Sequence, residues 1–142
     1  MVHELGIDSC ISLDGRSFDY DARSDSPILI GDLLTLRAEG QTSLLVQVLT
    51  KELSASRTVQ GTGIVLGKLD NGTLSRPDAR PFNTTEITRA DPRVLDPIVA
   101  RGGPAARVGT TRTGELPALL FANSFNRHTF LCGQSGSGKR TR

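Results

Sequence analysis

Residues 28–53 read ILIGDLLTLRAEGQTSLLVQVLTKEL, and they decide the fold class of this chain. Two apolar segments, 28–37 and 42–53, flank a turn at residues 38–41. Alternate residues of a strand point to opposite faces, and in the second segment both faces carry Leu or Val. Burial on both faces predicts strands of a β-barrel that packs against something else, or of an oligomer.

An amphipathic helix is the alternative for residues 43–53. The β-branched Val46, Val48 and Thr50 favour a strand instead, because such side chains fit a pleated, half-buried surface. One face of that strand would carry Leu44, Val46 and Val48, and the other Leu45, Gln47 and Leu49.

A further strand is predicted before this segment. Phe18 and Tyr20 alternate with Asp19 and Asp21, which is the period of a half-buried strand. The aspartates of residues 1–25 lack the spacing, glycine and terminal glutamate of an EF-hand loop. A solvated strand face therefore explains them better than a calcium site.

Two more strands are predicted after it. Residues 58–69, TVQGTGIVLGKL, form a strand interrupted by Gly61 and Gly63, and interior glycines let a sheet bend sharply, as small barrels require. A dinucleotide-binding fingerprint is excluded here, because no helix follows and the third glycine is missing. Residues 70–72, Asp-Asn-Gly, predict a type I′ hairpin turn, and residues 82–89 predict another strand.

The pattern changes after residue 90. Asp91 and Pro92 are typical of a helix start, with Asp as the N-cap and Pro at the first position. Pro97 limits this helix to a short one, whose apolar face would carry Val94, Leu95, Ile98 and Val99. The sequence RGGP at 101–104 predicts a linker, and short strands are expected around residues 108–109, 113–115 and 117–121.

Length and composition limit the class of protein. The 142 residues suffice for one domain with a fragment of a second, and no apolar run approaches a membrane span. The N-terminus has acidic residues and no apolar core of a secretory signal, so Cys10 and Cys132 are expected to be reduced in a cytoplasmic protein. His3 and His128 have no further ligand at metal spacing, so no metal site is expected.

The net charge of +2 hides an asymmetry between the two parts of the chain. Residues 1–100 carry ten Lys/Arg and fourteen Asp/Glu, a net charge of −4, whereas residues 101–142 carry seven Lys/Arg and one Glu, a net charge of +6. A basic tail beside an acidic body can contact nucleic acid or phosphate, or its arginines can line a loop or a subunit contact. Few aromatic residues lie among the arginines, which argues against stacking of single-stranded bases.

Residues 128–142, HTFLCGQSGSGKRTR, contain the motif that points most directly to a binding function. The short apolar run Phe130-Leu131-Cys132 precedes Gly-x-x-x-x-Gly-Lys, the spacing of a phosphate-binding P-loop. In such a loop, backbone N–H groups surround phosphate oxygens and the lysine supplies a positive charge. The predicted nucleotide-binding residues are Gly133, Gln134, Ser135, Gly136, Ser137, Gly138 and Lys139.

One position departs from the P-loop pattern. Arg140 stands where a Ser or Thr hydroxyl would bind Mg²⁺, and Thr141 comes one residue later. One residue is about 100° around a helix, so Thr141 does not replace that hydroxyl. The alternative for SGSGK is a flexible Gly/Ser linker or a cloning remnant.

Taken together, these segments resemble the HerA-like branch of the HerA/FtsK ATPases. The specific part is VGTTRTGELPALL at 108–120 followed by NRHTFLCGQSGSGK at 126–139, whereas the first hundred residues match in position and strand content only. The matching residues are Val108, Gly109, Leu119, Leu120, His128 and Gly133 to Lys139.

The resemblance implies a mainly β chain with three parts. Residues 1–100 would form a small β-barrel like the HAS-barrel of that family. Residues 101–126 would be a linker with short strands, and residues 127–142 the first strand and P-loop of a truncated RecA-like α/β domain.

For the whole parent protein, the resemblance implies an ATPase or helicase that uses ATP and Mg²⁺ to move DNA through a hexameric ring. Its barrel would serve ring assembly and docking of a nuclease or effector partner. Residues 1–142 lack a Walker B strand, a sensor and an arginine finger. The chain is therefore expected to be a truncated or frameshifted fragment, without catalytic residues and without ATP hydrolysis of its own.

Two other functions remain open. The chain could be a stand-alone oligomerisation or protein-interaction module with a vestigial P-loop tail. A fragment of a rotary ATPase subunit has the same order of barrel and motor, but His128 and GQSGSGK resemble the HerA-like branch more closely.

Overall fold

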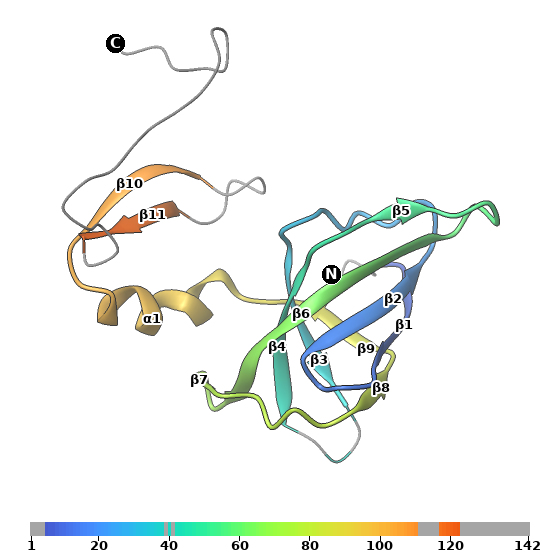
Figure 1. Cartoon of the computed structure of the whole chain (residues 1–142), viewed down its shortest axis with the longest axis horizontal. Coiled ribbons are helices and arrows are strands. Elements are labelled where there is room, and N and C mark those ends of the chain that lie inside the picture. The colour runs from blue at the N-terminus through green and yellow to red at the C-terminus, as the bar shows by residue number, and fades with distance from the viewer. Residues whose placement is uncertain (1–4, 39, 41, 111–116, 123–142) are drawn as a thin grey trace, which may run out of the picture.

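The computed structural model describes residues 5–38, 40, 42–110 and 117–122. Its main feature is one antiparallel sheet of nine strands that curls into a nearly closed barrel (Figure 1). The strands are β1 (Ile7–Ser12), β2 (Ser17–Ala22), β3 (Leu33–Arg37), β4 (Ser43–Val48), β5 (Glu52–Leu53), β6 (Val59–Asp70), β7 (Thr73–Ser75), β8 (Phe82–Thr84) and β9 (Glu86–Arg89). The mainly β class expected from the sequence is confirmed.

The two ends of the sheet are consecutive in the chain. The strand order is β8-β1-β2-β6-β4-β3-β9, and only Thr85 separates β8 from β9. The Thr84 hydroxyl donates to the carbonyl oxygen of Arg37 at 2.5 Å and accepts from the Glu86 N–H at 3.1 Å. One kinked segment therefore pairs with β1 on one side and β3 on the other, which brings the sheet close to closure.

The strand β6 is the central strand of this sheet, because β2, β4, β5 and β7 all pair with it. In the register of β2 and β6, Phe18 lies opposite Gly63 and Tyr20 opposite Gly61. A Cβ on Gly63 would lie 2.3 Å from the Phe18 ring, and one on Gly61 would lie 2.1 Å from the Thr50 carbonyl oxygen. The two predicted glycines thus make room for the aromatic rings and for the neighbouring backbone.

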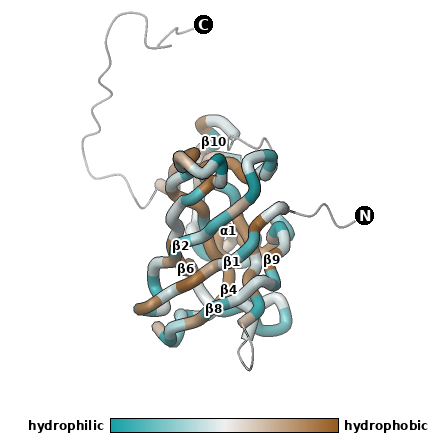
Figure 2. The backbone as a smooth tube through the Cα atoms, turned by 90° about the vertical axis from the view of Figure 1, so that its right-hand side faces the viewer, coloured by the Kyte–Doolittle hydropathy of each residue, from teal (hydrophilic) through white to brown (hydrophobic). Residues whose placement is uncertain are grey.

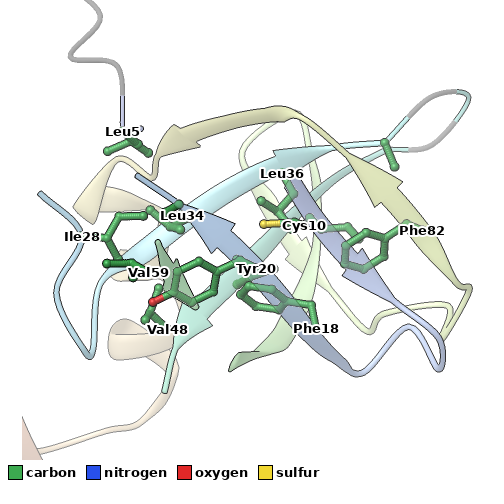
Figure 3. Close-up of a cluster of buried hydrophobic side chains, with 14 residues drawn as sticks. Leu5, Cys10, Phe18, Tyr20, Ile28, Leu34, Leu36, Val48, Val59 and Phe82 are labelled. Carbon is green, nitrogen blue, oxygen red and sulfur yellow. The ribbon is translucent and has the colours of Figure 1, made fainter. Parts of the chain in front are cut away.

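The barrel interior is filled by alternate residues of its strands. Phe18, Tyr20 and Ala22 of β2 are buried, while Asp19 and Asp21 point outward, as the alternation predicts. Figure 3 shows how these rings meet side chains from the other strands. The cluster comprises Leu5, Cys10, Phe18, Tyr20, Ala22, Ile28, Leu34, Leu36, Ala38, Leu44, Val46, Val48, Val59 and Phe82.

The predicted burial of the second face of β4 is confirmed for Leu45 and is wrong for Leu49, which follows the strand and is 43% exposed. Leu45 is fully buried, yet it does not belong to the cluster that fills the barrel, because it points to the opposite side of β4. On the same outer face, Thr35 and Ser43 line a hollow together with Val94, which follows the barrel. We infer that the chain after β9 passes over this face and contributes to the cover of Leu45.

Two predicted strands are shorter than expected. Residues 28–37 were predicted as one strand, but only Leu33–Arg37 is extended, because Gly31 adopts φ +95° and a turn joins the Asp32 N–H to the Leu29 carbonyl. Residues 42–53 divide into β4 and β5, because the N–H groups of Leu49 and Thr50 both point to the Thr62 carbonyl. The prediction overlooked the turn signal in Gly31-Asp32.

Other local predictions are confirmed. Asn71 and Gly72 have φ of 46° and 78°, as a type I′ turn requires at both central positions. Asp91 caps a 3₁₀ helix, η1 (Pro92–Leu95), by accepting from the Arg93 N–H at 2.9 Å. The short helix α1 (Asp96–Arg101) follows.

A separate two-stranded hairpin follows α1. It consists of β10 (Ala105–Thr110) and β11 (Pro117–Phe121), and Figure 1 shows it beyond α1, on the side of the barrel away from β2 and β5. Figure 2 shows apolar stretches both in the barrel strands and around β10. No described helix is long and apolar enough to cross a membrane.

Replacing Gly63 by Ala tests the fit between β6 and the aromatic rings. We expect Gly63→Ala to lower the free energy of unfolding by about 1–3 kcal/mol, because the new methyl group would overlap the Phe18 ring and the Gln47 carbonyl oxygen. Urea denaturation followed by circular dichroism measures the change. Gly109→Ala is the matched control, since a Cβ there meets nothing within 4 Å; equal losses in both variants would contradict the packing account.

Candidate functional site

The predicted nucleotide-binding residues, Gly133 to Lys139, lie outside the described residues, as do His128 and Cys132. Four residues on which the family resemblance depends are described. Val108 and Gly109 lie on β10, and Leu119 and Leu120 lie on the facing β11. Among the described elements, the hairpin therefore lies nearest in sequence to the predicted P-loop.

The hairpin contacts the C-terminal end of α1. The Phe121 ring lies against Gly102, where a Cβ would come within 2.2 Å of the ring. The Ala122 N–H donates to the Pro104 carbonyl at 2.8 Å, and the Gly102 N–H donates to the carbonyls of Ile98 and Val99. The contact of Phe121 with Gly102 joins the hairpin to the end of α1, and we call α1, β10 and β11 together the α1–hairpin unit.

This unit exposes apolar side chains. All six residues of β10 are exposed, and α1 buries none of its residues. The exposed fractions are 46% for Ile98, 37% for Val99, 59% for Val108 and 43% for Leu120. Because a two-stranded hairpin alone is marginally stable in water, such a surface is typical of one that packs against another part of a protein.

A second feature is an ion pair between the buried Asp32 and the exposed Arg89 of β9. The side chain of Asp32 is fully buried, and its Oδ2 accepts from Arg89 Nη1 and from the Leu29 N–H, both at 2.9 Å. Its Oδ1 has no hydrogen-bond partner in the described part of the chain. The Arg89 guanidinium also donates to the Pro27 carbonyl at 3.3 Å, so the pair fastens residues 27–32 to β9.

Lys51 holds the same loop from the other side. Its ammonium donates to the carbonyls of Ser26 at 2.9 Å and Ile28 at 2.7 Å. Both basic side chains thus satisfy backbone oxygens of a non-regular segment, and we assign them a structural role. This network was not predicted from the sequence, because its members are separated by many residues and only the Gly31-Asp32 turn marks it locally.

Burial inside the barrel keeps two groups, the Cys10 thiol and the Tyr20 phenol, protonated at neutral pH. Burial raises the pKa of the Cys10 thiol to about 12, and the nearby charge of Asp21 adds to the effect. Burial likewise raises the pKa of Tyr20 to about 12, with smaller contributions from Cys10 and Asp32. The Tyr20 hydroxyl donates to the Thr50 carbonyl at 2.9 Å, so it acts as a structural anchor.

A third feature is a shallow groove on the outer face of β2, β5 and β6. Asp19, Asp21 and Glu52 line it, together with Gln60 and Thr62. Gln60 Nε2 donates to Asp21 at 2.9 Å. Within the described ranges, no group of three or more His, Cys, Asp or Glu is arranged to hold a metal ion.

Comparison with protein-family models and with curated proteins finds no match for this chain. The geometry therefore defines a class only: a small, nearly closed β-barrel joined to an exposed α1–hairpin unit. The buried Asp32 and Tyr20 are held by structural hydrogen bonds within this barrel.

Removing the Asp32 carboxylate tests its structural role. We expect Asp32→Ala to lower the free energy of unfolding by about 1–3 kcal/mol, because the Leu29 N–H and the Arg89 guanidinium lose their acceptor. Asp25→Ala is the control, since Asp25 forms only an exposed pair with Arg23 and should cost less than about 1 kcal/mol. Urea denaturation of both variants measures the difference, and equal losses would contradict the assignment.

Thiol labelling tests whether the barrel interior stays closed. At pH 8 only on the order of 10⁻⁴ of Cys10 would be ionised, and the side chain is also buried, so iodoacetamide should leave it unmodified in the folded protein. Mass spectrometry of tryptic peptides separates Cys10 from Cys132 and measures each one. Labelling in guanidinium chloride provides the control, and fast native labelling of Cys10 would show that the barrel opens readily.

Proposed function

We propose that this chain is the N-terminal barrel and P-loop region of a HerA-like DNA-translocating ATPase, in which the barrel serves ring assembly and partner docking. The order of its parts supports the proposal. A nearly closed barrel formed by β1 to β9 precedes the α1–hairpin unit, and the spacing Gly-x-x-x-x-Gly-Lys at 133–139 follows. The hairpin carries the residues that match the family pattern just before the P-loop sequence.

The proposed nucleotide site consists of residues 133–139. Its three glycines would allow backbone N–H groups to approach ATP phosphates closely, and Lys139 would supply a positive charge. Arg140 offers no hydroxyl for Mg²⁺, so the metal would depend on ligands from the rest of the parent protein. A P-loop lysine alone neither holds the metal nor positions the attacking water, and residues 1–142 are therefore proposed not to hydrolyse ATP by themselves.

A second candidate function is a stand-alone module for oligomerisation or protein interaction, with a vestigial P-loop tail. The exposed Val108 and Leu120 of the hairpin favour it, because they require a cover whether or not a motor domain exists. The gene sequence beyond codon 142 separates the two candidates. A motor domain in frame, or restored by a one-base shift, supports the first candidate, and its absence from all frames supports the second.

An ATPase assay tests the proposed limit on the chain itself. We expect purified residues 1–142 to release no phosphate from ATP above the level of buffer, with or without Mg²⁺ and DNA. Colorimetric phosphate detection measures the release. Lys139→Ala is the control, and turnover of about 1 s⁻¹ or faster that this substitution abolishes would contradict the proposal.

A further inference from the structure

The outer face of β1, β2, β6 and β5 forms a continuous acidic surface. The strand registers place Asp21 between Ser9 and Gln60, and Glu52 opposite Gln60. In the next row, Asp19 lies between Ile11 and Thr62. We call the surface made by Ile11, Asp19, Asp21, Glu52, Gln60 and Thr62 the acidic face.

The charges of the acidic face are not neutralised within the described part of the chain. The four described ion pairs involve other carboxylates, namely Asp25, Asp78, Asp32 and Asp91. Ile11 adds an exposed apolar side chain, 42% accessible, beside Asp19. The acidic face thus combines free negative charge, a shallow groove and apolar area.

The α1–hairpin unit has the complementary properties. Arg101 and Arg107 are exposed, and neither forms an ion pair with a described residue. They outnumber the one acidic residue of α1, β10 and β11, the exposed Asp96. The apolar residues Ile98, Val99, Val108 and Leu120 are exposed on the same unit. The charge difference also holds for the whole sequence, since residues 1–100 have a net charge of −4 and residues 101–142 a net charge of +6.

The two surfaces lie apart within one chain. Figure 1 shows the α1–hairpin unit on one side of the barrel, whereas β2 and β5 lie toward the other side. We propose that the acidic face of one copy binds the α1–hairpin unit of a second copy, so that subunits associate head to tail. This inference rests on the proposed role of the barrel in ring assembly, and it names the two surfaces that would meet.

Charge and apolar burial favour contact of the acidic face with the α1–hairpin unit over contact between two acidic faces. Juxtaposing two acidic faces would bring like charges together, whereas Arg101 and Arg107 can donate paired N–H groups to carboxylates. Burial of the hairpin's apolar residues against Ile11 and the groove would remove them from water. Contact between two different surfaces leaves one of each free at the ends, so it produces a closed ring or an open filament instead of a closed dimer.

Complementary charge reversals in the full chain test the proposal. We expect the unaltered protein to exceed monomer mass in size-exclusion chromatography with light scattering, and its assembly to weaken as salt is raised. Variant A carries Asp19→Arg and Asp21→Arg, and variant B carries Arg101→Glu and Arg107→Glu. Each variant alone should elute as a monomer, because its affinity for itself should be about tenfold or more below that of the unaltered protein.

Mixing the variants distinguishes head-to-tail contact from other arrangements. The intact α1–hairpin unit of variant A complements the intact acidic face of variant B, and the reversed face of variant A complements the reversed unit of variant B. An equimolar mixture should therefore regain assembly, with the two variants alternating. A chain that carries all four substitutions should regain assembly, because both charge patterns are exchanged. The control variant carries Asp70→Arg and Glu86→Arg. It changes the net charge by the same amount as variant A, but at residues outside both surfaces, and should assemble normally.

Several outcomes would overturn the inference. They are an unaltered protein that stays monomeric, variants A and B that assemble alone, a mixture that stays monomeric, or a fourfold variant that stays monomeric. Circular dichroism of each variant shows whether its barrel is folded. The test uses neither nucleotide nor DNA, so its failure would leave the proposed ATPase relationship to be judged by the gene sequence beyond codon 142.

Discussion

The packing of two aromatic rings over two glycines is the constraint on which the rest of the barrel depends. Phe18 and Tyr20 cover the inner side of β6 at Gly63 and Gly61, where any side chain would meet a ring or a neighbouring carbonyl. Because β6 pairs with four other strands, a shift at these glycines would be passed to most of the sheet. The glycines also let the long strand curve, so a single fit gives the barrel both its bend and its register.

The fold was predictable where a pattern is local. Alternation placed Phe18 inside and Asp19 outside, and Asn71-Gly72 fixed a hairpin turn, because each signal depends on neighbouring residues only. The full extent of the strand at 28–37 was predicted wrongly, since apolar content outweighed the turn at Gly31. The closure of the sheet through Thr85 was not predictable in this way, because it depends on partners far apart in the sequence.

The candidate surfaces were predictable in a weaker sense. The sequence showed that the charge is divided between an acidic first part and a basic second part, but not that Asp19, Asp21 and Glu52 share one face. That arrangement arises from the pairing of β2 and β5 with the same strand, β6. The pair of the buried Asp32 with the exposed Arg89 was missed for the same reason, as 57 residues separate them. The P-loop remains a prediction from spacing.

The kinked segment at Thr85 has a consequence for how the chain is made. Strands β8 and β9 protect the edges of both β1 and β3, so neither edge has a partner until residues 82–89 are available. During synthesis, a ribosome that has not yet released this segment holds an incomplete sheet with two open edges. Open edges are sites where chains pair with one another and aggregate. Residues 82–89 therefore protect the newly made chain from aggregation once they pair with β1 and β3.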